Sequence, residues 1–139
     1  MNAPLHRDLS VLVIDDQRTM RLIVRQLLRQ IGVTRVSEAG DGREAVAKLA
    51  DREIETPDLV ICDLHMEGMD GMAFTAAVRR NKTKLAPETP VLLLTGESDD
   101  FVLDVVAQAG ATMVLHKPIT AGELYQAVSR AIGFQLAGA

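Results

Sequence analysis

The chain has 139 residues, the size of one ordinary domain, and 47% of them are hydrophobic. Charged residues make up 24%, so the composition is that of a globular protein and excludes a disordered or fibrous chain. The formal net charge of −4 argues against a protein whose main partner is nucleic acid, because such domains are usually basic.

Five short apolar segments, most of them rich in β-branched residues, have the length of strands. Four are continuous rather than alternating runs, which is typical of parallel strands covered on both faces. The second segment is weaker. In chain order the predicted strands are 11–14, 36–39, 59–62, 91–94 and 113–115.

Between the strands, apolar residues recur at the three- and four-residue spacing of a helix that packs on a sheet. Gly32, Gly110 and Gly133 stand where three of the helices would end, and Thr120 with Glu123 forms a capping box for the last one. The predicted packed stripes are Met20, Ile23, Val24, Leu27, Leu28 and Ile31; Ala45, Val46 and Leu49; Met72, Phe74, Ala77 and Val78; Val102, Val105, Val106 and Ala109; and Leu124, Ala127, Val128 and Ala131. Strands that alternate with helices predict a doubly wound α/β fold with a five-stranded parallel sheet.

The predicted elements fill one domain, 1–139, with a core at about 10–132, short tails and no output domain. No apolar run approaches the length of a membrane span, and the first residues lack the apolar segment of a signal peptide. Cys62 is the only cysteine, which suits a reducing compartment. We therefore expect a cytoplasmic protein with no membrane insertion.

Polar residues follow the strands at their carboxyl ends, the edge where open parallel sheets bind ligands. Asp15 and Asp16 follow the first strand, and Asp63, Thr95 and Lys117 follow the third, fourth and fifth. One such residue alone is usually a cap or turn residue, but five at one edge indicate a site. Carboxylates about 4 Å apart repel by about 4 kcal/mol at an effective dielectric constant of 20, so three of them require a cation, and oxygen ligands suit Mg²⁺. Asp63 is then placed to form an aspartyl phosphate, with Thr95 and Lys117 beside the phosphate oxygens.

These motifs resemble the receiver domain of bacterial two-component response regulators, and most of all its stand-alone, CheY-like chemotaxis type. The resemblance covers about 10–132 and implies a flavodoxin-like (βα)5 fold with strand order 2-1-3-4-5. The segments that carry it are Val13-Ile-Asp15-Asp16, Ala39-Gly-Asp-Gly42-Arg-Glu-Ala45, Asp63-Leu-His-Met-Glu-Gly-Met-Asp70-Gly71, Leu94-Thr95-Gly96 and His116-Lys117-Pro118. The likeness to the chemotaxis type is carried by Asp15-Asp16-x-x-Thr-Met-Arg21-x-Ile-Val-Arg25-x-Leu-Leu28.

The resemblance implies a signalling switch and not an enzyme, apart from Mg²⁺-dependent autophosphorylation and autodephosphorylation. Asp63 would accept a phosphoryl group from a histidine kinase or a histidine phosphotransfer protein. The protein would then bind an unidentified downstream target protein, as a monomer or a weak phosphorylation-dependent dimer. The implied metal ligands are Asp15, Asp16, Asp63 and the backbone carbonyl of His65, and the Lys117–Pro118 peptide is expected to be cis.

Two positions depart from the family pattern. Val114 stands where chemotaxis-type members usually carry an aromatic residue that moves when the threonine shifts toward the phosphate. We therefore expect the signal to travel through Thr95 to the helix that bears Phe101 and Leu103, which lie off its packed stripe. His65 replaces an asparagine, and it is either a pH-sensitive modulator of water access or an exposed loop residue with a steric influence only.

A basic stripe runs along the first predicted helix at three- and four-residue spacing: Arg18, Arg21, Arg25 and Arg29. It is either a solvated helix face or a dock for an acidic partner surface. Two other functions are alternatives, one because it also forms an aspartyl phosphate and the other because it has the same topology. A haloacid-dehalogenase-like phosphatase would need an aspartate at position 65, and a flavodoxin-like carrier would need a Ser/Thr-rich phosphate loop where Asp15 and Asp16 stand.

Overall fold

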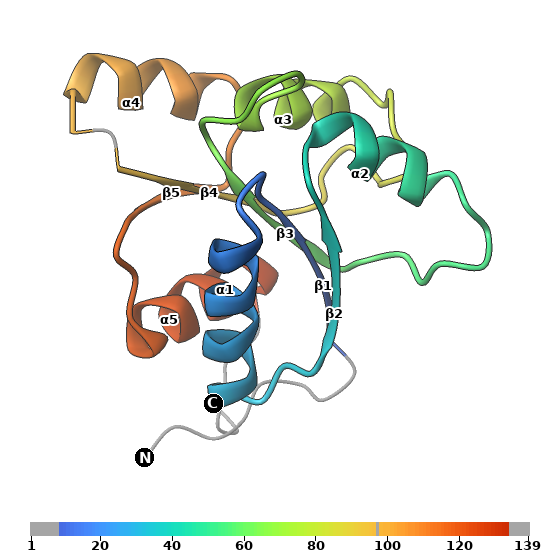
Figure 1. The fold of residues 1–139 in the computed structure, drawn as a ribbon. Helices are drawn as coiled ribbons and strands as arrows, with labels where there is room; N and C mark the ends of the chain where they lie inside the picture. Colours follow the sequence, from blue (N-terminus) through green and yellow to red (C-terminus); the bar gives the residue numbers. More distant parts are fainter. Residues whose placement is uncertain (1–8, 97, 134–139) are drawn as a thin grey trace.

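The fold is a five-stranded parallel sheet with helices on both faces, seen in a computed structural model that describes residues 9–96 and 98–133 (Figure 1). The strands lie in the order β2-β1-β3-β4-β5, which confirms the predicted topology. The elements in chain order are β1 (Ser10–Ile14), α1 (Arg18–Gln30), β2 (Arg35–Ala39), α2 (Gly42–Leu49), β3 (Leu59–Asp63), α3 (Gly71–Arg79), β4 (Val91–Thr95), α4 (Asp100–Gln108), β5 (Met113–His116) and α5 (Ala121–Ile132).

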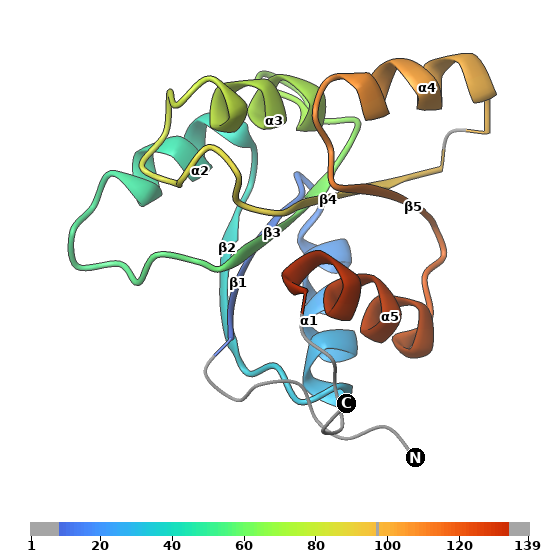
Figure 2. The ribbon, with the colours of Figure 1, turned by 180° about the vertical axis from the view of Figure 1, so that it is seen from behind.

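Two apolar clusters, one on each face of the sheet, hold the layers together. Helices α1 and α5 cover one face, and α2, α3 and α4 cover the other (Figures 1 and 2). The three inner strands β1, β3 and β4 are buried along their whole length, as their continuous apolar runs predict. Their carboxyl ends therefore carry whatever chemistry the sheet presents.

The outer elements differ from the predicted pattern at three places. Strand β5 is an edge strand, so its residues are half-buried or exposed rather than covered on both faces. Ile23 of α1 is 45% exposed and Val105 of α4 is 40% exposed, although helical spacing placed both on packed stripes. Spacing alone gives the face of a helix, but it does not say how far the sheet extends beneath that face.

Helix ends follow the predicted chemistry closely. Gly32, Gly110 and Gly133 all have positive φ values at or just after the ends of helices. Thr120 and Glu123 form both hydrogen bonds of the capping box at the start of α5. None of the helices in the described part of the chain has the length and apolar character needed to cross a bilayer.

The start of α3 lies directly against the end of β3. The Asp70 side chain caps the helix by accepting a hydrogen bond from the Ala73 amide at 2.8 Å. A Cβ atom added to Gly71 would lie 2.5 Å from the Asp63 carbonyl oxygen and 3.0 Å from the Leu64 Cα. Only glycine allows this close approach, so α3 fixes the backbone of the segment after β3.

We expect Gly71→Ala to lower the free energy of unfolding by about 1–3 kcal/mol, because backbone atoms and a core leucine must move to admit the new methyl group. Gly122→Ala in α5 is the matched control, because its Cβ would meet only the Thr120 hydroxyl oxygen, at 4.0 Å. That variant should keep or slightly increase the stability. Urea unfolding followed by circular dichroism measures both changes, and equal stabilities for the two variants would contradict the close-packing argument.

Candidate functional site

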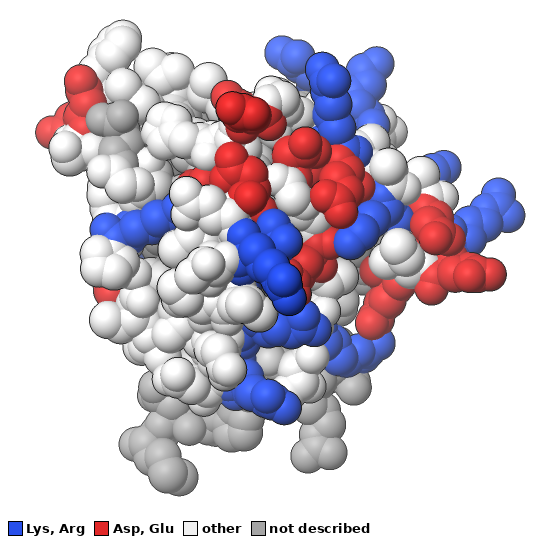
Figure 3. All heavy atoms as spheres, viewed as in Figure 1, with Lys and Arg blue, Asp and Glu red and all other residues white. Residues whose placement is uncertain are grey.

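Three aspartates meet at the carboxyl end of the sheet. Asp63 is the last residue of β3, Asp15 directly follows β1, and Asp16 follows Asp15. One carboxylate oxygen from each lies within 4.8 Å of those of the other two. Asp15 and Asp63 are buried, whereas Asp16 is exposed. On the face shown in Figure 3, acidic side chains gather above α1, and basic side chains lie beneath them along that helix.

Lys117 supplies the cation nearest to the buried carboxylates. Its Nζ atom lies 2.9 Å from Asp63 Oδ1 and 3.8 Å from Asp15 Oδ2. Its backbone N–H donates to the Thr95 carbonyl at 2.8 Å, which joins the ends of β4 and β5. The Lys117–Pro118 peptide is cis, as the resemblance implies. Thr95 is fully buried, and thus all five residues predicted for this edge lie at it.

The environment of Asp15 explains why this cluster suits a metal ion. Burial raises the pKa of the Asp15 carboxyl and nearby Asp63 raises it further, while the Gln17 amide and Lys117 act in the opposite direction. The Gln17 N–H donates to Asp15 Oδ1 at 2.9 Å. One lysine therefore leaves negative charge in excess, and a cluster made only of carboxylate oxygens fits Mg²⁺.

Burial and the neighbouring Asp63 also raise the pKa of the Cys62 thiol well above its usual value. The side chain of Cys62 points away from the chemistry into the apolar cluster under α3. A buried neutral thiol is unreactive, so Cys62 is a core residue.

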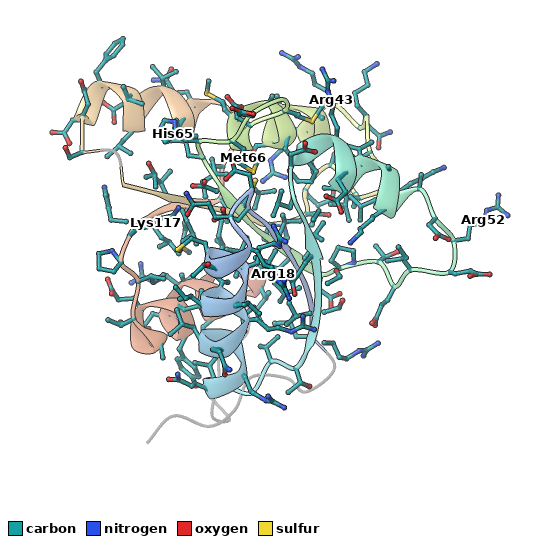
Figure 4. All side chains as sticks on the ribbon, in the orientation of Figure 1. Arg18, Arg43, Arg52, His65, Met66 and Lys117 are labelled. Carbon is teal, nitrogen blue, oxygen red and sulfur yellow. The ribbon has the colours of Figure 1, made fainter. Side chains whose placement is uncertain are left out.

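The segment between β3 and α3 forms the rim of the site and rests on α2. His65 is exposed and Met66 is half-buried, and both lie on this segment. Lys117 follows β5 and Arg18 begins α1, and these four side chains lie around this end of the sheet (Figure 4). The Gly42 N–H donates to the Met69 carbonyl at 3.0 Å, and a Cβ on Gly42 would lie 2.6 Å from Met69 Cγ. Sequence reasoning missed this contact, because its only signal is a glycine at the start of a helix.

The basic stripe of α1 divides into two parts. Arg21 Nε donates to a Glu38 carboxylate oxygen at 3.0 Å, and Arg25 pairs with the other oxygen of Glu38. Arg18 and Arg29 are exposed. Half of the stripe is therefore engaged within the fold, and Glu38 of β2 is a partner that the helical spacing did not reveal.

The two β2 carbonyls at Val36 and Glu38 also accept hydrogen bonds from basic side chains. Arg25 Nη2 donates to the Val36 carbonyl at 3.2 Å, and Lys48 donates to the Glu38 carbonyl. In the described part of the chain β2 pairs with β1 and with no second strand. Side chains from α1 and α2 thus donate hydrogen bonds to backbone carbonyl groups of an edge strand.

Helix α4 presents apolar side chains to solvent. Phe101 is 75% exposed, Leu103 is half-buried, and Val105 is exposed beside them. Val114 is half-buried and packs against the cluster that contains Val106. The exposed apolar group therefore lies on the helix that follows Thr95 and not at position 114.

Comparison with known proteins agrees with this geometry. The family model described as response regulator receiver domain matches residues 11–129. The chain is 36% identical over 126 residues to a probable chemotaxis protein CheY of Rhizobium etli, covering 90% of this chain and 93% of the relative. It is 33% identical over 130 residues to the chemotaxis protein CheY-3 of Vibrio cholerae, covering 94% of this chain and 96% of the relative.

Solved structures give the same result. The chemotaxis protein CheY4 of Vibrio cholerae superposes with a TM-score of 0.75 at 33% identity, over 88% of this chain and 98% of that one. A response regulator receiver domain protein from Clostridium thermocellum superposes with a TM-score of 0.77 at 29% identity, over 90% of this chain and 94% of that one. The match to the family model covers most of the chain, and the fold and the acidic edge accord with it. The protein belongs to the response regulator receiver domain family and is a phosphoacceptor switch of two-component signalling.

Proposed function

We propose that the protein accepts a phosphoryl group on Asp63 in a Mg²⁺-dependent reaction and then changes its partner-binding surface. The observation that carries this assignment is the place of the Asp63 carboxylate, buried at the end of the central strand between Asp15 and Lys117. A carboxylate that is held on one side by a fixed cation and on the other by further carboxylates suits in-line attack on a phosphate.

In the proposed reaction an Asp63 carboxylate oxygen attacks the phosphorus atom of a phosphohistidine. The new P–O bond forms as the P–N bond breaks, and the imidazole leaves with the electron pair of that bond. Lys117 balances the charge on the phosphoryl oxygens, and the Thr95 hydroxyl donates a hydrogen bond to one of them. The same attack on acetyl phosphate, with acetate as the leaving group, would give autophosphorylation. Attack of water on the phosphorus atom of the aspartyl phosphate would release inorganic phosphate and restore the Asp63 carboxylate.

Asp15, Asp16 and Asp63 are the side chains that would hold Mg²⁺, with the His65 backbone carbonyl as a further ligand. When bound, the ion neutralises the phosphate oxygens and the carboxylates together. The protein's own part is to hold the Asp63 carboxylate in place, through the hydrogen bond from Lys117 at 2.9 Å and the packing of α3 behind it.

The wider role follows from this chemistry. The phosphoryl donor would be a histidine kinase or a histidine phosphotransfer protein in the cytoplasm, and chain 1–139 would act as one receiver domain. The similarity to CheY proteins supports a chemotaxis-type output. With valine at position 114, the signal would pass from Thr95 to α4, where Phe101 and Leu103 form the reporting surface.

Asp63→Asn should abolish phosphorylation by acetyl phosphate in the presence of Mg²⁺, because the amide is not a nucleophile for phosphorus. Asp104→Asn is the matched control, since Asp104 is exposed on α4 and lies outside the acidic cluster. It should react at the wild-type rate. Intact-protein mass spectrometry reads the added phosphoryl group, and its appearance on Asp63→Asn at the wild-type rate would refute the assignment.

Mg²⁺ should raise the melting temperature of the wild-type protein, because a ligand at 100 times its Kd stabilises the native state by about 2.7 kcal/mol. Asp16→Asn should respond much less, since it removes one ligand. Without metal, Asp15→Asn should melt higher than wild type, because it removes a buried charge beside Asp63. Differential scanning calorimetry with and without Mg²⁺ measures all three, and equal Mg²⁺ responses of wild type and Asp16→Asn would exclude this metal site.

The phosphoryl mimic beryllofluoride should shift the amide NMR signals of residues 95–103 more than those of the residues around Val114. Residue 97, within the first range, lies outside the described residues. Phe101→Ala should weaken binding to the target or phosphorylation-dependent self-association. Val114→Ala, the comparison variant, should bind within a few fold of wild type. If Val114→Ala instead loses as much binding as Asp63→Asn while it stays folded, the valine is itself the switch.

A further inference from the structure

Arg21 lies behind the acidic cluster rather than within it. Its Nη1 atom donates to the backbone carbonyl of Asp15 at 2.7 Å, and its Nε atom donates to Glu38 Oε1 at 3.0 Å. The side chain is only 19% exposed, so these hydrogen bonds are largely screened from water. One planar guanidinium group thus joins the end of β1 to the neighbouring strand β2.

The Asp15 backbone is held at both of its polar atoms. Its N–H donates to the Ala39 carbonyl at 3.1 Å, and its carbonyl accepts from Arg21. The carbonyl orientation sets the plane of the peptide between Asp15 and Asp16, because the atoms of a peptide unit are coplanar. Arg21 therefore fixes the direction in which the chain leaves β1.

Asp16 depends on this backbone more than the other two aspartates do. The Asp15 carboxylate accepts a hydrogen bond from the Gln17 amide, and the Asp63 carboxylate accepts one from Lys117. Among the described residues, no group donates a hydrogen bond to the Asp16 carboxylate, which is exposed. Its place in the cluster is thus set by the peptide that precedes it, and the carbonyl of that peptide is the one bonded to Arg21.

We propose that Arg21 is a positioning residue that holds the Asp15–Asp16 peptide in the orientation the cation site needs. This inference rests on the Mg²⁺ site of the proposed function. If Arg21 acts by positioning the peptide, its removal should change the Mg²⁺ affinity in the opposite direction from the one expected if it acts only through its charge. A nearby positive charge repels Mg²⁺, so removal of the charge alone would tighten binding, whereas loss of positioning weakens it.

The test compares Arg21→Met with Arg25→Met. Both variants remove a guanidinium group that pairs with Glu38 from the same helix, but only Arg21 contacts the Asp15 carbonyl. Mg²⁺ alone is titrated, and the amide NMR shifts of residues 15–17 give its Kd. We expect the Kd of Arg21→Met to rise about 10-fold, the scale on which groups that orient metal ligands act, and that of Arg25→Met to stay near wild type.

A second measurement separates positioning from damage to the chemistry. The rate of phosphorylation by acetyl phosphate should fall for Arg21→Met at limiting Mg²⁺ and return close to wild type at saturating Mg²⁺. Arg21→Lys, which keeps the charge and one donor group, should lose less Mg²⁺ affinity than Arg21→Met. If Arg21→Met does not fold, the Mg²⁺ affinities of Arg21→Lys and Arg25→Lys are compared instead.

The outcomes distinguish this inference from the function on which it rests. A wild-type protein whose signals do not respond to Mg²⁺ would contradict the proposed metal site. A wild-type response together with unchanged or tighter binding in Arg21→Met would overturn the positioning role. Equal weakening in Arg25→Met would overturn it as well, because the effect would then belong to Glu38 and not to the Asp15 carbonyl.

Discussion

The site depends on the contact between the Lys117 ammonium group and two buried carboxylates. Asp15 and Asp63 are taken out of water by the same fold that brings them together, and burial together with the nearby Asp63 raises the pKa of the Asp15 carboxyl. Lys117 lies 2.9 Å from one and 3.8 Å from the other, and it offsets part of this repulsion without removing it. The remaining negative charge gives the site its attraction for a divalent cation.

Most of the architecture can be predicted from the sequence because the inner strands carry a strong signal. Continuous apolar runs at β1, β3 and β4 are buried on both faces, and polar residues directly after them can only lie at the carboxyl edge of a parallel sheet. Position relative to a buried strand is thus enough to bring Asp15, Asp63 and Thr95 together. Lys117 follows the edge strand β5, and the resemblance to a known family is what makes its placement firm.

What the sequence could not supply are contacts between elements that no short motif encodes. Ile23 and Val105 have the right spacing for packed residues, yet both are exposed, because helical spacing does not say how much of a helix face the core covers. The bonds of Arg21 and Arg25 to Glu38 join residues 17 and 13 positions apart, so helical periodicity makes these arginines look like solvated charges. The close approach of Met69 to Gly42 depends on how the segment after β3 meets the start of α2. Such contacts decide how firmly the site is held, while the motifs decide what it contains.

The hydrogen bonds from Arg25 and Lys48 to the carbonyls of β2 have a consequence for the behaviour of the protein in a crowded solution. Strand β2 is an outer strand, and the backbone groups of such strands can recruit strands from other molecules. Here two of its acceptors are occupied by cationic side chains, which also place positive charge where an approaching strand would lie. The same arginine and lysine that join α1 and α2 to this strand thus also disfavour the pairing of a strand from another molecule with β2.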